Sequence, residues 1–331
     1  MRNFKRCTWI LLMLCLFLGI NELLTYLLYP YTYTRADMHH LTEGEYETLI
    51  VGTSHGKCGL DPKILEETTG EKTINVCQGG QYPVDSYYLV REAARHRKLT
   101  RVIYELDAGY WVTVPNQSAD YITFYHEMLW SYVKAEYFWD KMLDADFRTV
   151  LFPWYFYRKE FKRTGVLLEQ KQSEVYKTYG VQPFDSEVQT YREDGFIERH
   201  PLSSDRQQED SPSLWQEPGA REDARNAFDK MADFCEKEGI RLDVVITPVP
   251  WVTYEKYQEQ YDAADVFFKE YLGLRKIPFY NYVNDRSQGI PGELEEFADY
   301  DGHMYEETAA GFSRVFGENL KKQSLRGSKI E

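Results

Sequence analysis

A short apolar run that ends at a glycine and a serine constrains the fold of this chain more than any other stretch. Residues 49–51 (Leu-Ile-Val) precede Gly52, and the chain then turns polar through Thr-Ser-His-Gly. Such a run is typical of a strand buried on both faces, as in a parallel sheet. Ser54 is therefore predicted at the carboxyl end of a strand, the edge where open α/β sheets bind ligands. The alternative is that Ser54 only caps a turn, because turns favour serine.

Strand and helix patterns alternate on both sides of a long interruption. This alternation predicts an α/β fold with a parallel sheet and right-handed crossovers. The expected strands cover residues 47–52, 72–77, 101–106, 242–247 and 278–283, and the expected helices cover 61–68, 82–98, 219–238, 263–274 and 306–322.

The interruption is predicted to be a helical and loop insertion at about residues 112–218. Helical patterns over 125–143 and 147–162 are rich in aromatic side chains, and the polar stretch 183–218 is expected to be a surface loop. Insertions at the carboxyl edge of a sheet often shape a binding groove. A helical cap that only covers the sheet explains the pattern equally well.

The N-terminal segment predicts a membrane anchor. Arg2, Lys5 and Arg6 precede a mainly apolar stretch over residues 7–29, which reaches the length needed to span a bilayer. No small-residue cleavage site follows it. Basic residues before the span place the N-terminus in the cytoplasm and the remainder outside. The expected organisation is a cytoplasmic tail at 1–6, a transmembrane anchor at 7–29, a connector at 30–45 and an extracytoplasmic domain at 46–325.

Composition excludes some classes of partner. The net charge of −14 argues against a nucleic-acid surface. Three cysteines lie outside the span, an odd number that does not imply a full disulfide framework. The chain has no metal-ligand spacing of the Cys-x-x-Cys or His-Glu-x-x-His kind, so we expect no metal and no cofactor.

The predicted strand ends bring together the parts of a nucleophilic serine site. A serine nucleophile needs a base, a group that orients the base, and donors for the oxyanion. His303, in the loop before the closing helix, is the expected base for Ser54. Asp301 is the first choice to orient it, and Asp299 is the second. The expected oxyanion donors are the backbone N–H groups of Ser54 and of Gly79 or Gly80.

Three features in this order resemble the SGNH (GDSL-like) hydrolase superfamily: Gly-Thr-Ser near the start, a glycine turn after the second strand, and Asp with His before the last helix. Gly-Thr-Ser-His with Gly-Leu-Asp-Pro, followed by Asn75-x-x-Gln-Gly-Gly-Gln, is similar to its membrane-anchored members. These include the teichoic-acid D-alanyl-transfer protein and the proteins of polysaccharide O-acetylation. The resemblance covers residues 46–111 and 219–325.

The resemblance implies a three-layer α/β/α fold of the flavodoxin-like SGNH type, with sheet order 2-1-3-4-5. It implies Ser54 as nucleophile, His303 as base and an aspartate as the third member. The family's acid lies three residues before the histidine, where this chain has Tyr300. The Gly-x-Asn-Asp block is replaced by Asp107-Ala108-Gly109, so an oxyanion donor from Asn75, Gln78 or Gln81 is an open alternative.

Neighbouring side chains have more ordinary interpretations. His55 adjoins Ser54, but its side chain is expected to point elsewhere. Lys57 is expected to be solvated, with attraction of an anionic substrate as the alternative. Trp111 follows a strand end and either lines the crevice or belongs to the core. The expected substrate-lining residues are Gln81, Asp107 and Trp111.

Two functional hypotheses follow. The first is an anchored, extracytoplasmic serine esterase or O-acyltransferase that acts on a cell-envelope glycopolymer. By resemblance, its partner is a multipass membrane O-acyltransferase. The second is a non-catalytic anchored protein that binds a glycan or serves as a scaffold for that acyltransferase. The altered acid spacing and the missing asparagine block favour the second hypothesis, and the intact serine, glycine turn and histidine favour the first.

Overall fold

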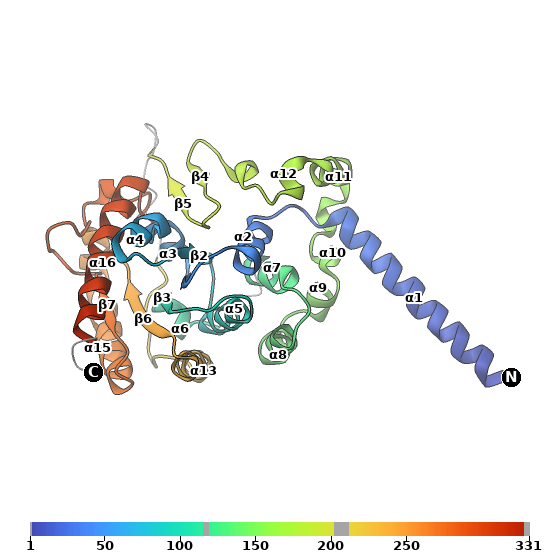
Figure 1. Ribbon diagram of the computed structural model, residues 1–331, viewed down its shortest axis with the longest axis horizontal. Coiled ribbons are helices and arrows are strands. Elements are labelled where there is room, and N and C mark those ends of the chain that lie inside the picture. Colours follow the sequence, from blue (N-terminus) through green and yellow to red (C-terminus); the bar gives the residue numbers. More distant parts are fainter. Residues whose placement is uncertain (1, 115–118, 202–211, 328–331) are drawn as a thin grey trace. The chain divides into compact units, whose positions relative to one another are not determined.

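The computed structural model describes residues 2–114, 119–201 and 212–327, and it has an α/β/α architecture around a parallel sheet (Figure 1). The sheet has five strands in the order β2-β1-β3-β6-β7, which is the predicted 2-1-3-4-5 order. Neighbouring strands pair in parallel, for example Ile50 with both Asn75 and Ile103. The strands are β1 (Thr48–Val51), β2 (Thr73–Asn75), β3 (Arg101–Glu105), β6 (Arg241–Ile246) and β7 (Phe279–Asn281).

Helices cover both faces of this sheet because successive strand residues point to opposite sides. Ile103 packs into a cluster with residues of two helices that contact each other, α4 (Pro62–Thr69) and α16 (Glu306–Gly327). The next residue, Tyr104, packs on Phe228 of the opposite layer, with ring centroids 5.5 Å apart. That layer contains α5 (Pro83–His96), α13 (Glu222–Glu238) and α15 (Gln258–Leu274). Shorter elements of the sheet unit include α6 (Gly109–Val112), α14 (Trp251–Lys256) and η4 (Leu294–Glu296).

The expected start and end of the first long helix are confirmed. The Asp61 side chain accepts a hydrogen bond from the backbone N–H of Lys63 at 2.9 Å, and Pro62 occupies the first helical position. Gly70 ends α4 in the left-handed conformation, with φ of 80°. A capping aspartate, an N-terminal proline and a C-terminal glycine are therefore reliable signals in this chain.

The helices expected within the insertion are shorter than the sequence pattern predicts. The expected helix 125–143 is two helices, and Ser131 caps the second of them through a hydrogen bond from the amide of Lys134. The expected helix 147–162 is interrupted at Pro153, which has no amide hydrogen and disfavours a helical residue before it. The elements are α7 (Ala119–Glu127), α8 (Tyr132–Asp140), η1 (Met142–Asp144), α9 (Phe147–Leu151), α10 (Pro153–Phe156), η2 (Arg158–Arg163), α11 (Thr164–Gln172) and α12 (Glu174–Lys177).

Two regions expected to be irregular contain regular structure. The connector forms α2 (Tyr33–Glu43). The start of the expected surface loop forms a turn, η3 (Gln182–Phe184), and an antiparallel hairpin of β4 (Gln189–Tyr191) and β5 (Ile197–Arg199). The hairpin turn meets the sheet, because the backbone N–H of Asn75 donates to the carbonyl of Asp194 at 2.9 Å. The rest of that expected loop includes residues 202–211, which lie outside the described residues.

The chain divides into two units. The sheet unit holds residues 36–121 and 181–331, and the helical unit holds residues 1–35 and 122–180. In the helical unit, α1 (Arg2–Leu28) is long and apolar enough to cross a membrane over Phe4–Leu28. The centre of the predicted insertion therefore belongs with α1. The boundaries predicted from the sequence at 7–29, 30–45 and 46–325 stay predictions.

A buried ion pair joins three elements of the sheet unit. The Lys57 ammonium of α3 (Ser54–Gly59) lies 2.7 Å from the Asp37 carboxylate of α2, and the Tyr191 hydroxyl of β4 donates to that carboxylate at 2.8 Å. Lys57 is 2% exposed, so the expectation of a solvated lysine is wrong. Removing one partner of a buried pair leaves a buried charge without compensation.

We expect Lys57→Met to lower the free energy of unfolding by about 3–5 kcal/mol, because Asp37 would remain buried without its cation. The measurement is urea unfolding of the detergent-solubilised full chain, followed by tryptophan fluorescence. Lys63→Met on the exposed face of α4 is the matched control, with an expected change within about 0.5 kcal/mol. Equal effects of the two substitutions would contradict this interpretation.

Candidate active site

Ser54 is the first residue of α3, which follows β1 at the carboxyl edge of the sheet. The sequence pattern predicts a turn at this point, and the structure begins a helix there instead. Thr53 is its N-cap and has extended backbone, and its hydroxyl accepts a hydrogen bond from the amide of His55. Threonine is a common N-cap, so the helix begins where the strand ends.

A buried carboxylate fixes the end of the strand before Ser54. Glu105, the last residue of β3, is 1% exposed. One of its oxygens accepts hydrogen bonds from the backbone N–H of Thr53 at 2.7 Å and from its hydroxyl at 2.9 Å. Gly52 has φ of 149°, and a Cβ there would lie 2.5 Å from the Glu105 carbonyl oxygen. This close approach requires glycine.

Sequence reasoning missed Glu105, although a signal was present. A glutamate at the end of an otherwise apolar buried strand needs a partner, because charged side chains are rarely buried alone. Its partner is the Thr53 that precedes the candidate nucleophile. The strand that lies beside β1 therefore positions Ser54.

His303 connects Ser54 with an aspartate. Its Nε2 lies 2.8 Å from Ser54 Oγ, and its Nδ1 lies 2.7 Å from Asp299 Oδ2. With its proton on Nδ1 donated to Asp299, the ring accepts the Ser54 hydroxyl proton at Nε2. This geometry matches the relation between a nucleophile, a base and the group that orients the base.

The Asp299 carboxylate is held in its charged form. Burial alone would raise the pKa of Asp299, but hydrogen bonding and the charge of the His303 ring outweigh burial. Backbone N–H groups of Gly302 and His303 also donate to its Oδ1, at 3.0 and 3.1 Å. The pKa of Asp299 is therefore held well below its usual range, and the carboxylate is ionised at neutral pH.

The contact expected between Asp301 and His303 is corrected to Asp299. A bridge between Phe297 and Met304 closes the loop, and Gly302, with φ of 114°, lets the chain fold back over Asp299. Two backbone N–H groups then point at Asp299, which spacing along the sequence does not reveal. The Asp301 carboxylate instead lies 3.6 Å from Nε2 of His55. The catalytic role of Asp299 stays a prediction.

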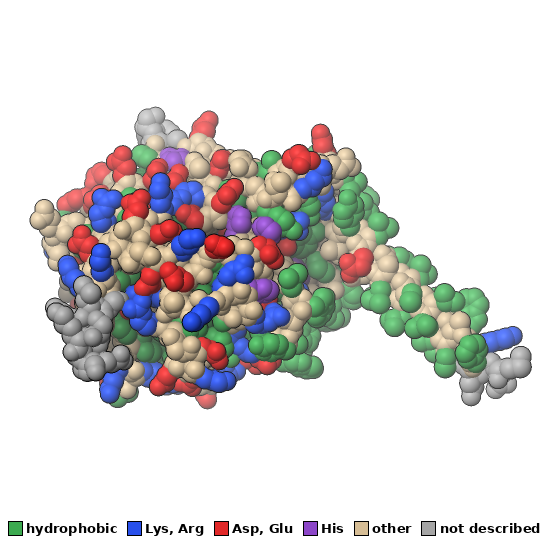
Figure 2. All heavy atoms as spheres, in the orientation of Figure 1, with side chains coloured by type: hydrophobic (Ala, Val, Ile, Leu, Met, Phe, Trp, Pro, Cys, Tyr) green, Lys and Arg blue, Asp and Glu red, His purple; other side chains and the backbone are tan. Residues whose placement is uncertain are grey.

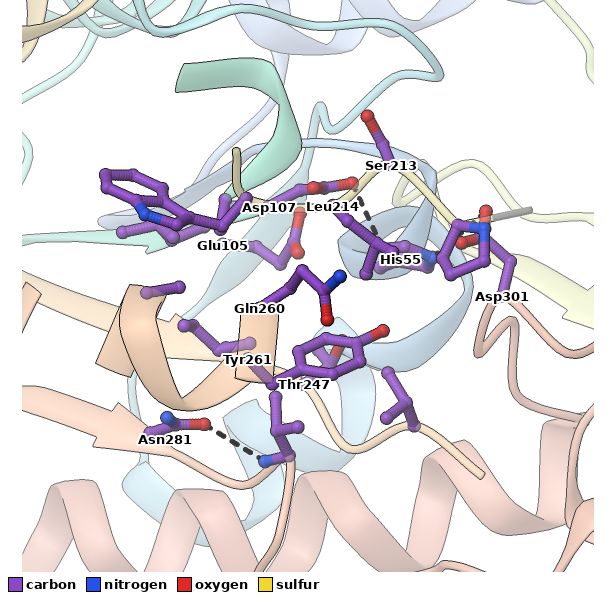
Figure 3. Close-up of a pocket in the computed structure, with 18 residues that line it drawn as sticks. His55, Glu105, Asp107, Ser213, Leu214, Thr247, Gln260, Tyr261, Asn281 and Asp301 are labelled. Carbon is purple, nitrogen blue, oxygen red and sulfur yellow. Dashed lines mark hydrogen bonds and ion pairs between the residues drawn. The ribbon is translucent and has the colours of Figure 1, made fainter. Parts of the chain in front are cut away.

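His55 belongs to the site, contrary to the expectation that its side chain points elsewhere. Its ring packs on that of His303, with centroids 4.7 Å apart. Its Nδ1 lies 3.5 Å from the Asp107 carboxylate, and its Nε2, on the other side of the ring, faces the Asp301 carboxylate. Figure 3 shows these two carboxylates and that of Glu105 around the imidazole. A histidine beside three acidic groups is placed to carry a positive charge.

The pKa values in this cluster follow from burial and charge. Burial alone would lower the pKa of His55, but Asp301 and then Asp107 outweigh it and raise the pKa to about 10. Burial raises the pKa of Asp107 to about 7, against the opposing charge of His55. Burial alone would raise the pKa of Asp301, but the charge of His55, its hydrogen bond and the charge of His303 together outweigh burial and lower the pKa. His55 is thus an imidazolium at neutral pH, next to the candidate base.

A cavity of about 40 Å³ adjoins His55 and is too small for a sugar. Asp107 lines it, and Gln260 and Tyr261 of α15 border it (Figure 3). Its volume suits a few water molecules. Ser54 and His303 do not line it, so the cavity is separate from the space in front of the nucleophile.

Of the expected oxyanion donors on the glycine turn, Gly79 lies close to Ser54. A Cβ on Gly79 would be 3.9 Å from the Cβ of Ser54, so the glycine turn does approach the nucleophile. Among the residues that the structure describes, the backbone N–H groups of Ser54 and Gly79 donate to no protein acceptor. The same is true of Gly80. Their role as oxyanion donors stays a prediction.

Several expected site residues have structural partners instead. Trp111 is fully buried among Tyr104, Phe228 and Phe268, so its expected substrate-lining role is wrong. Asn75 cannot serve the oxyanion, because its amide donates to the carbonyls of Gly56 and Leu60.

Gln81 is nearly buried, and its amide donates to the Ser86 hydroxyl at 2.8 Å. Its expected place in the substrate crevice stays a prediction. His55, Asp301 and His303 place ligand atoms within 4.8 Å of one another, a spacing that a metal ion needs. The histidine nitrogens already face Ser54, Asp299, Asp107 and Asp301, so protein contacts already engage these ligand atoms.

Comparison with known proteins assigns no family. No family model matches the chain, and no curated protein matches it. Seven solved chains do match. One is the crystal structure of a candidate acylhydrolase from Bacteroides fragilis, at 11% identity and a TM-score of 0.39, covering 90% of this chain and 95% of that chain. A structural similarity at this TM-score does not support a function. Any function proposed for this chain therefore depends on the geometry of its site.

We expect Asp299→Asn to lower ester hydrolysis by about ten-thousandfold, because an uncharged partner holds the imidazole in the wrong tautomer. Asp301→Asn should have a much smaller effect, since Asp301 contacts His55 and not His303. The measurement is the turnover of 4-nitrophenyl acetate by the detergent-solubilised full chain. The reverse ranking would assign the role to Asp301, and no effect of either change would leave a Ser-His pair.

The charge of His55 is tested separately. In ¹⁵N-histidine NMR spectra assigned through His55→Asn, both ring nitrogens of His55 should stay protonated at pH 8. In Asp107→Asn/Asp301→Asn, burial is opposed only by the Glu105 carboxylate, so the His55 pKa should fall well below its wild-type value. Titration of wild-type His55 near pH 6.5 would show that the carboxylates do not hold the charge.

Proposed function

We propose that this protein is a membrane-anchored serine esterase or O-acyltransferase whose nucleophile is Ser54. One observation carries the proposal: Ser54 Oγ, the His303 ring and Asp299 form a continuous hydrogen-bonded series, at 2.8 and 2.7 Å. These three residues come from the end of the first strand and from a loop 245 or more residues later. An aspartate thus reaches the ring despite the altered spacing, which weakens one of the two arguments for the scaffold alternative; the other, the missing asparagine block, stands.

The chemistry follows from these positions. Ser54 Oγ attacks the carbonyl carbon of an acyl donor while His303 Nε2 takes the hydroxyl proton. The bond between the acyl carbon and the leaving oxygen breaks, and His303 returns the proton to that oxygen. An acceptor hydroxyl, from water or from a sugar or polyol, then attacks the Ser54 ester and gives its proton to His303. The bond between the acyl carbon and Ser54 Oγ then breaks, and His303 returns the proton to Oγ, which restores the Ser54 hydroxyl and leaves the acyl group on the acceptor. Asp299 orients the ring and stabilises its positive form throughout.

The substrate and the partner are proposed from the resemblance in sequence. The membrane-anchored relatives that share Gly-Thr-Ser-His and the glycine turn act in teichoic-acid D-alanylation and polysaccharide O-acetylation. We therefore propose a cell-envelope glycopolymer as acceptor and a multipass membrane O-acyltransferase as partner. The apolar helix α1 supports an anchored protein with a cytoplasmic N-terminus and an extracytoplasmic sheet unit.

We expect Ser54→Ala to reduce ester release to background, a loss of at least about a thousandfold, because no other hydroxyl replaces the nucleophile. Stability should change little, since one oxygen is removed at a partly exposed helix start. A serine-directed phosphonate should add to Ser54 in the wild type, as detected by mass spectrometry, and not in the variant. Ser287→Ala, in an exposed loop, is the matched control. If folded Ser54→Ala supports normal acylation of envelope polymer in cells, the scaffold hypothesis replaces the enzyme.

A further inference from the structure

The helical unit exposes more large hydrophobic side chains than the described part of the sheet unit does. Among the described residues of the sheet unit, exposed large hydrophobic side chains are limited to Val114, Val252, Val266 and Leu274. In residues 122–180, aromatic and aliphatic side chains on several consecutive helices are exposed. Figure 2 shows such side chains gathered over this unit and along α1. The exposed set, here called the apolar face, includes Trp130, Tyr132, Trp139, Leu143, Phe147 and Phe161.

The exposure follows helical spacing. In α8, Val133 and Tyr137 are buried, while Tyr132 and Trp139 on the other side are 61% and 67% exposed. Other side chains of residues 122–180 are buried, among them Phe124 and Val150. The apolar face is therefore one side of folded helices and not an unpacked segment. Contiguous exposed patches of this kind mark interaction surfaces.

The depth of the apolar face follows from α1. About 20 residues at 1.5 Å each cross the hydrocarbon core, so an entry at Cys7 puts Phe17 near the middle and Tyr26 near the outer end. Phe17 contacts Phe152, with ring centroids 5.7 Å apart. With that entry, the segment joining α9 and α10 lies near the middle of the hydrocarbon core, where the outer leaflet begins.

Polar contacts along α1 fit the same depth. Asn21, which interrupts the apolar run, accepts a hydrogen bond from the indole N–H of Trp154 at 2.8 Å. A polar side chain in the membrane needs such a partner. Lys171 donates to the carbonyl of Tyr26, near the end of α1. The helical unit therefore satisfies the polar groups of α1 where lipid could not.

The charges of the unit complement a lipid surface. The whole chain carries a net charge of −14, but residues 122–180 have nine Lys and Arg against eight Asp and Glu. Four of the nine lie in η2, which contacts α1 and exposes Phe161. Trp and Tyr side chains beside Lys and Arg are typical of the membrane interface, and basic clusters bind anionic headgroups.

We propose that the helical unit of α1 and residues 122–180 is inserted into the outer leaflet, with its apolar face among the acyl chains and η2 at the phosphate headgroups. The proposal depends on α1 being the anchor. The insertion then serves as a second membrane attachment and not as a wall of a glycan groove. Phospholipid is the occupant because the surface continues from the spanning helix and combines aromatic with basic side chains.

The test places a fluorescent label on the full chain in phosphatidylcholine–phosphatidylglycerol vesicles. The native exposed cysteines, Cys7 and Cys15, are replaced by serine, and single cysteines are introduced by Leu143→Cys or Val166→Cys, both in the helical unit. Leu274→Cys and Val266→Cys in the sheet unit are matched controls of the same residue types and are at least as exposed. Each site carries an environment-sensitive NBD group. The quenchers are lipids with a doxyl group near the headgroup, or aqueous iodide.

Doxyl lipid should remove most of the emission at positions 143 and 166, and iodide should not. The two control positions should show the opposite. Iodide quenching at 143 and 166 equal to that at 274 would overturn the proposal. Protection of these sites from both quenchers would also overturn it, because protein would then cover the face.

A label on native Cys15 in the Cys7→Ser variant tests whether α1 is in the membrane. This result separates failure of the interfacial insertion from failure of the α1 anchor. Cys15 in lipid with positions 143 and 166 in water overturns the proposal of interfacial insertion alone. Cys15 in water overturns the anchor as well.

Discussion

The two hydrogen bonds of His303 hold together segments from opposite ends of the chain. One reaches Ser54 at the start of α3, and the other reaches Asp299 within the same loop. Both depend on the loop between Phe297 and Met304, which is closed by a bridge and folds back at Gly302. The parallel sheet brings the loop and the strand end to one edge, and the loop then determines which aspartate meets the ring.

Buried carboxylates do most of the positioning around this contact. Glu105 accepts two hydrogen bonds from Thr53 and so fixes the residue before the nucleophile. Asp107 and Asp301 hold His55 as an imidazolium, packed on the candidate base. The site is thus an arrangement of alternating charges in a partly dry region, where each charge is stabilised by its neighbours and would be costly alone. Glu105 also explains the two glycines of the Gly-Thr-Ser-His-Gly stretch, because a Cβ on Gly52 would lie 2.5 Å from the Glu105 carbonyl oxygen and a Cβ on Gly56 would lie 2.9 Å from the Glu105 Cβ.

Under the proposed function, the division into two units assigns membrane attachment to the helical unit and chemistry to the sheet unit. The sheet unit contains the serine site, the small cavity and the buried ion pair of Lys57 with Asp37. The helical unit contains α1 and the aromatic helices of the insertion, and its exposed side chains suit lipid more than water. In the proposal made here, the insertion serves attachment to the membrane and not the groove that its position in the chain suggests.

The sequence alone determined the sheet. The strands and main helices follow from local signals: apolar runs, an aspartate cap before Pro62 and a glycine at residue 70. The 2-1-3-4-5 order follows from the resemblance in sequence. The local signals also predict that Ser54 and His303 meet, because carboxyl ends of parallel strands share one edge. Tertiary structure decided the rest. Whether Asp299 or Asp301 contacts His303 depends on the backbone of one loop, and the charge of His55 depends on side chains from three segments. The placement of residues 122–180 with α1 depends on packing between segments far apart in the chain. Periodicity along the chain reports only local structure and does not predict such packing.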